Sequence, residues 1–272
     1  MPDYLDIHRL FDRPYDSFDN SMLGPAFADE LATVSRLWFA CGYRPGVAAY
    51  LNFFLLREFN VTHDRAFPAR FASFRSMADS FYRTDVFIRD VTDSGPQPTG
   101  GISSTAVRAA LTNIMQRHRK LAIPEWMMTY FGFSLVEGVE KVAAANGGLS
   151  KSDCRLHLAY MTTAFRIMGI AFSEDREVMQ RFARLIERDH AGLSPHAEQH
   201  ARHIFVLGEM IGVSSKLDQI GPMLPERTRA VLAEIYERVR PNPIRRHAAR
   251  LLGRLLMKRA IGSQRQAVPV AD

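Results

Sequence analysis

A histidine in a basic segment, His118, belongs to a stretch whose residue types could hold a haem iron. It follows apolar side chains that recur as on one helix face, and it stands among Arg117, Arg119 and Lys120. A haem needs a rigidly held nitrogen donor, an apolar pocket for the macrocycle and cations for its propionates. The uncharged run 126–136 provides the apolar residues. A helix C-terminus also favours a histidine through its dipole alone, so this composition permits haem binding without requiring it.

Three further histidines, at positions 196, 200 and 203, form a second candidate site. Their spacings of four and three place them along one side of a helix, where they could hold zinc or iron with His190 or Glu198 nearby. Ligands that lie two turns apart on one helix seldom converge on one ion. The same spacing is also typical of an exposed polar face, so both interpretations stay open.

The elements that must position these residues are predicted to be helices. Pro124 restricts Ile123 to an extended conformation and is tolerated in a first helical turn, so a helix with Glu125 near its positive end is expected to begin there. Ser150 and Asp153 have the spacing of an N-terminal capping box. Apolar residues recur at helical spacing elsewhere, and no convincing strand period occurs. Helices are expected to begin near residues 25, 45, 66, 107, 124, 151, 175, 195, 225 and 244.

This pattern predicts an all-α fold, a single globular domain of roughly eight to ten helices around a buried cofactor pocket. Residues 1–24 are expected to form an N-terminal arm packed on the body. The helical domain would span residues 25–262, and residues 263–272 would form a disordered tail. The Gly/Pro/Ser-rich stretch 93–104 is interpreted as a loop, because a domain boundary there would leave two thin cores.

The composition narrows the class of protein. A hydrophobic content of 47% in 272 residues is enough for a sizeable core. The formal net charge of +6 suits an anionic partner, but arginine-rich solvated helices explain it equally well, and no nucleic-acid-binding signature occurs. Cys41 and Cys154 form no CxxC motif, which disfavours a disulfide framework or a thiolate zinc site. The acidic, mixed opening does not resemble a secretory signal, so a cytoplasmic location is expected.

The final helical segment alternates leucines with basic residues. Peripheral contact with an anionic membrane would use this basic amphipathic pattern. The alternative is a helix docked on the core by its leucines, with its arginines in solvent. The residues concerned are Leu251, Leu252, Leu255 and Leu256, with Arg246, Arg250, Arg254 and Lys258.

Several motifs together resemble the oxygenase family that includes MpaB and the latex-clearing rubber oxygenases. The central motif is His118, then Ile123-Pro124, then a helix with Met128 and Tyr130 entering a Phe/Val-rich run. Upstream, Thr84 resembles the threonine of the family's R-x-x-x-T element. Downstream, Tyr160 and the ending Met168-Gly169-Ile170 resemble a second family helix, and the stretch 187–190 resembles an acidic, histidine-containing helix end. The resemblance covers roughly residues 11–190.

The resemblance implies an all-α fold that holds haem b, with His118 as the axial iron ligand. It further implies a haem-dependent oxygenase that uses O2 on an apolar substrate such as an isoprenoid. Thr84, Arg83, Arg117 and Arg119 would be the other cofactor-binding residues. Arginines of the family pattern are replaced here by Ser80, by Met115 and by Thr162 or Thr163, so Arg117, Arg119 or Lys120 would pair with the propionates instead.

Two alternatives remain at this stage. The protein could be a non-catalytic helical protein of the same fold that binds a hydrophobic ligand, or a non-haem metal enzyme built on the histidine helix. If the protein is an oxygenase, the sequence does not identify the group that would act on the open side of the haem. The acidic residues near the Thr84 helix, Glu58, Asp79 and Asp85, are the candidates.

Overall fold

The computed structural model describes residues 25–55, 73–92, 123–190 and 196–266, together with 109, 111, 113, 114 and 116. Within these residues the chain forms ten α-helices and one short 3-10 helix, with no strand, which confirms the all-α prediction. Several predictions concern residues outside the described ranges. They are the N-terminal arm 1–24, the loop 93–104, Glu58, Arg117, His118, Arg119, Lys120 and the last residues 267–272.

The helices mostly begin close to the positions that the periodicity predicts, although the one expected near residue 66 begins at 74 and the short one at 217 was not expected. They are α2 (Pro25–Cys41), α3 (Arg44–Phe54), α5 (Phe74–Thr92), α7 (Glu125–Ala145), α8 (Lys151–Ile167), α9 (Arg176–His190), α10 (Ala197–Met210), α11 (Leu217–Ile220), the 3-10 helix η4 (Gly221–Met223), α12 (Glu226–Val239) and α13 (Pro243–Gln266).

Local sequence signals account for two of the helix starts. The Ser150 hydroxyl accepts a hydrogen bond from the backbone N–H of Asp153 at 3.0 Å, and the Asp153 carboxylate accepts one from the Ser150 N–H at 3.0 Å, so the predicted capping box is present. Helix α7 begins directly after Pro124. Its first residue, Glu125, accepts the Ala171 N–H at 2.9 Å, which anchors the segment that follows α8 to the start of α7.

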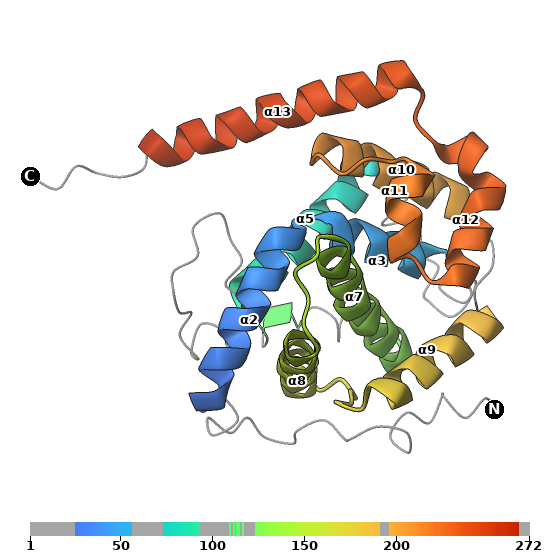
Figure 1. Cartoon of the computed structure of the whole chain (residues 1–272). Coiled ribbons are helices and arrows are strands. Elements are labelled where there is room, and N and C mark those ends of the chain that lie inside the picture. The colour runs from blue at the N-terminus through green and yellow to red at the C-terminus, as the bar shows by residue number, and fades with distance from the viewer. Residues whose placement is uncertain are drawn as a thin grey trace, which may run out of the picture.

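Helix α7 is the central element of the fold, with α3, α2, α8 and α9 packed around it (Figure 1). Its uncharged run is buried, and Phe133, Val136 and Val139 are at most 1% exposed. The prediction of a buried core helix at this place is therefore confirmed. Among the described residues, no helix has the length and apolar character needed to cross a membrane.

A buried polar chain ties four helices together. The Trp38 indole N–H of α2 donates to His157 Nε2 of α8 at 3.1 Å, so the proton of His157 lies on Nδ1, which is 3.3 Å from the Glu140 carboxylate of α7. Arg176 of α9 donates to the same carboxylate at 2.7 Å and helps to lower the pKa of Glu140 against the cost of burial. Both ring nitrogens of His157 thus have partners within the protein, and the chain joins α2, α7, α8 and α9.

The last helix, α13, differs from the expectations in two ways. It continues through Gln266, four residues into the segment expected to be a disordered tail, because no proline interrupts it before Pro269. Helix α13 does pack on α10, as the docked alternative expects, but Leu251, Leu252 and Leu255 do not make that contact. These three leucines are about half exposed, so the expectation that they dock the helix is wrong.

Candidate functional site

An apolar cavity of about 110 Å³ lies between α3, α5, α7 and the C-terminal end of α8. Its walls are aromatic and aliphatic apart from three hydroxyl groups at one edge. The lining residues are Tyr50, Phe53 and Phe54 from α3, Ser80, Thr84, Phe87 and Ile88 from α5, Met128, Phe131 and Leu135 from α7, Phe165 and Met168 from α8 and its end, and Ile114 and Ile123. Such a lining suits an apolar ligand with a small polar group.

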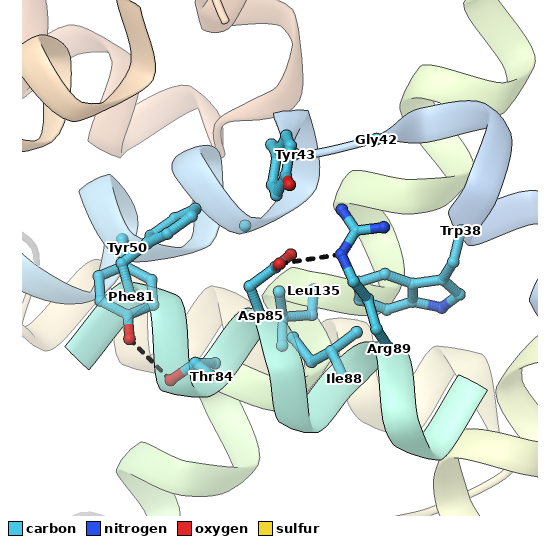
Figure 2. A pocket seen from close by; sticks show the side chains of 11 residues that line it. Trp38, Gly42, Tyr43, Tyr50, Phe81, Thr84, Asp85, Ile88, Arg89 and Leu135 are labelled. Carbon is cyan, nitrogen blue, oxygen red and sulfur yellow. Dashed lines mark hydrogen bonds and ion pairs between the residues drawn. The ribbon is translucent and has the colours of Figure 1, made fainter. Parts of the chain in front are cut away.

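The hydroxyl groups gather where this cavity meets a smaller one. The Tyr50 hydroxyl lies 2.8 Å from Thr84 Oγ1 and 3.3 Å from Ser80 Oγ. Tyr50 and Thr84 line both cavities, and Figure 2 shows the bond between them. The smaller cavity, about 20 Å³, therefore forms a polar end to the apolar one.

An ion pair lines the smaller cavity. Arg89 Nε donates to Asp85 Oδ2 at 2.8 Å within α5, and the Arg89 guanidinium lies over the ring of Tyr43 at 4.6 Å (Figure 2). Burial raises the pKa of Asp85, and the pairing with Arg89 offsets part of that rise. Of the three acidic residues near Thr84, Asp85 alone lines a cavity, whereas Asp79 is exposed and Glu58 lies outside the described residues.

The predicted cofactor residues fall into three groups. Thr84 lines both cavities, whereas Arg83 is exposed and lines neither. Arg117, His118 and Arg119 lie outside the described residues. The described residues four before and five after His118 are Ile114 and Ile123, and both line the apolar cavity. The histidine is thus flanked in sequence by two residues of the cavity wall.

The residues of the second family helix are structural or line the cavity. The Tyr160 hydroxyl donates to the Val91 carbonyl and so joins α8 to the end of α5. Met168 lines the apolar cavity, and Gly169 ends the helix in a left-handed conformation with φ of 75°. Thr162, one of the two threonines expected in place of an arginine of the family pattern, is buried, and its Oγ1 has no hydrogen-bond partner.

The three histidines of the histidine helix lie in different surroundings. His196 is exposed and precedes the first turn of α10, while His200 is fully buried with its ring 4.7 Å from that of Phe54. His203 lies against Phe74, with ring centroids 5.9 Å apart. Burial, with smaller effects from His196 and His203, lowers the pKa of His200 to about 4. No group of three metal-ligating side chains that could hold an ion occurs in the described ranges, so these residues give the non-haem metal interpretation no support.

A wider cavity of about 380 Å³ lies at the C-terminal end of α7. Two cationic residues, Arg44 and Lys141, line it together with polar and aliphatic residues, and none of the described lining residues is aromatic. Arg44 is exposed. Because its lining mixes charged, polar and aliphatic groups, this cavity suits an apolar ligand less well than the apolar cavity, despite its larger volume.

A buried hydrogen-bond network next to the site was not predicted. Thr228 donates to Asn52 Oδ1 at 2.6 Å, and Asn52 Nδ2 donates to Tyr130 and to Ser134, each at 2.8 Å. The Tyr130 hydroxyl reaches Glu187 at 3.2 Å. Four helices, α3, α7, α9 and α12, are joined in this way. The one signal in the sequence was a lone asparagine in the apolar stripe of α3.

Glu187 of α9 is the acidic end of this network. Burial raises the pKa of the Glu187 carboxyl to about 7, and the hydrogen bond from Tyr130 offsets part of the effect. Nearby Glu137 adds to the rise, while Lys141 and Arg184 oppose it. The native state therefore holds a proton that the unfolded state loses in the interval from about pH 4.5 to 7.

Native stability is expected to fall as the pH rises through this interval, because the unfolded carboxyl ionises more readily than the native one. The Glu187→Gln side chain keeps an oxygen that can accept from Tyr130, and it does not ionise. The variant should therefore be more stable than the wild type at pH 8, by about 1 to 3 kcal/mol. This range is reduced because the Glu187 side chain is partly exposed to solvent. The measurement is the urea unfolding free energy of both proteins at pH 5 and pH 8. Glu177→Gln, on the exposed side of α9, is the control. An equal difference at both pH values would contradict this assignment.

Comparison with known proteins finds no matching protein-family model, no matching curated protein and no matching solved structure.

Proposed function

We propose that the apolar cavity binds haem b with His118 as the axial ligand, and that the protein is a haem-dependent oxygenase acting on an apolar substrate with O2. The observation that carries the proposal is the position of Ile114 and Ile123. They flank His118 in the chain, and both line the cavity. The sequence motifs around His118 resemble those of haem-containing oxygenases, which supplies the identity of the ligand.

The chemistry of the lining fits part of a haem. Phe53, Phe131, Phe165 and their aliphatic neighbours suit the faces of a macrocycle. The cations for the propionates are a weaker match among the described residues. No cation is among the described residues that line the apolar cavity, and Arg89 in the adjoining one is paired with Asp85. Arg117, Arg119 and Lys120 are therefore proposed for that role.

The residues of this chain would bind and orient the reactants. The haem would supply O2 activation, while the aromatic and aliphatic walls hold an apolar substrate and exclude water. The hydroxyls of Tyr50, Ser80 and Thr84 provide hydrogen bonds for a polar group at one edge. Since the Tyr50 hydroxyl is buried and its pKa is raised by that burial, it stays protonated and can donate.

The visible absorption spectrum tests this proposal. Purified protein titrated with haem should develop a Soret band, and His118→Ala should lose or displace it. His247→Ala, which removes an exposed histidine of α13, is the control and should leave the spectrum unchanged. A wild-type protein that takes up no haem, or a His118→Ala spectrum identical to the wild type, would refute the assignment.

A second candidate function is a non-catalytic carrier of a hydrophobic ligand. It is favoured by the absence of a cation among the described lining residues of the apolar cavity and by Ser80 in place of a family arginine. Under this proposal the protein stays colourless but binds a fluorescent fatty-acid probe. Replacing Phe131 by tryptophan, which would fill the cavity, should weaken that binding.

A further inference from the structure

Helix α13 turns an apolar face toward solvent. Residues at positions 244, 248, 251 and 255 follow spacings of four, three and four, which places them on one side of a helix. Ile244 is 80% exposed, and Leu251 and Leu255 are each 52% exposed. This outward apolar face is defined by Ile244, Ala248, Leu251, Leu252 and Leu255.

Close packing against α10 keeps α13 in this orientation. The opposite side of α13 meets α10 through Ala249 and Gly253, and a Cβ atom added at Gly253 would lie 1.9 Å from the Met210 carbonyl oxygen. No leucine could take that place without separating the two helices. The Arg250 Nε also donates to the buried Glu209 carboxylate at 2.7 Å. Small residues and an ion pair therefore face the protein, and leucines face outward.

The charge of α13 indicates what kind of surface its outward apolar face would bind. From residue 241 to 266 the sequence contains no Asp or Glu and seven basic residues. On the helical wheel Arg254 and His247 border one edge of the outward apolar face and Arg245 borders the other, and all three are exposed. Two copies of this helix would repel each other, whereas anionic lipid headgroups would attract it.

We propose that the outward apolar face of α13 inserts into the headgroup region of an anionic membrane, with the helix lying parallel to the surface. Leucines that point away from the body and basic residues at their borders are the arrangement of an interfacial helix. The contact is peripheral, because no described helix could cross a membrane. The proposal does not depend on haem, and it gives the protein access to lipid-dissolved apolar molecules.

Sedimentation with vesicles tests this surface. The full chain should bind phosphatidylcholine vesicles that contain phosphatidylglycerol and bind pure phosphatidylcholine vesicles more weakly. In the double variant Leu251→Glu and Leu255→Glu, partitioning should fall by at least about tenfold, because two inserting side chains become anionic. Phe39→Glu is the control, since Phe39 of α2 is 58% exposed and lies off this face.

Three outcomes would overturn the proposal. The wild type could fail to bind the anionic vesicles, or the double variant could bind as well as the wild type. Light scattering could instead show a wild-type dimer that the double variant dissociates, which would assign the face to a second copy of the chain. The helical circular dichroism of the variants is measured alongside, and it should be retained because both leucines are half exposed.

Discussion

Replacing Asn52 by leucine is expected to lower the free energy of unfolding by about 2 to 4 kcal/mol. Asn52 is 1% exposed and accepts from Thr228 while donating to Tyr130 and Ser134. Leucine has the same branched arrangement of four side-chain heavy atoms and is the larger of the two, so the loss comes from hydrogen bonds and not from a cavity. The Thr228 hydroxyl would be left buried without its acceptor, which costs more than the loss of a solvated bond.

A double-mutant cycle with Thr228→Val isolates this effect. Thr228→Val alone removes one donor and should cost about 1 kcal/mol. In the double variant the orphaned hydroxyl is gone, so the combined loss should be smaller than the sum of the two single losses. Urea denaturation measures all four proteins. Strict additivity would show that Thr228 and Asn52 are not coupled as the distances indicate.

Gly132→Ala is expected to destabilise the protein by about 2 to 3 kcal/mol, against the helix propensity, which favours alanine by about 1 kcal/mol. A Cβ atom at this position of α7 would lie 2.3 Å from Cζ of Phe165. That ring cannot move away easily because it stacks on Phe172 at 4.7 Å. Phe165 also lines the apolar cavity, so ligand binding should weaken together with stability.

Ala144→Gly in the same helix is the matched control. Ala144 is exposed, so its replacement should cost only the propensity difference of about 1 kcal/mol. The measurement is the thermal unfolding of both variants. Gly132→Ala reports the effect of crowding Phe165, and Ala144→Gly reports helix propensity alone. If Gly132→Ala were as stable as the wild type or more stable, α7 and α8 could move apart at this contact without loss of stability.

The candidate site was predictable only in part. Thr84 was expected to bind the cofactor, and it lines both cavities. Met128 and Met168 belong to the motifs of the family resemblance, and both residues line the apolar cavity. The hydroxyl cluster of Tyr50 and Ser80 was not foreseen, because it joins α3 to α5 and no local spacing encodes that contact.

The histidines show why spacing alone misleads. His196, His200 and His203 have a plausible ligand spacing, yet the contacts of the helix decide what each ring does. Because α10 packs against α3, His200 is buried on Phe54, while His196 remains outside the helix. A pattern of residue types carries no information about which face a neighbouring helix covers.

The amino-acid sequence by itself determined the helical class, the helix starts and the capping box. These depend on periodicity and on interactions within a few residues, so they are local properties. Only the tertiary structure decided that Glu187 is half-buried beside Tyr130 and that α13 turns Leu251, Leu252 and Leu255 outward. Both depend on which helix covers which face. For α13 that choice follows from the close approach at Gly253, a contact between residues far apart in the chain.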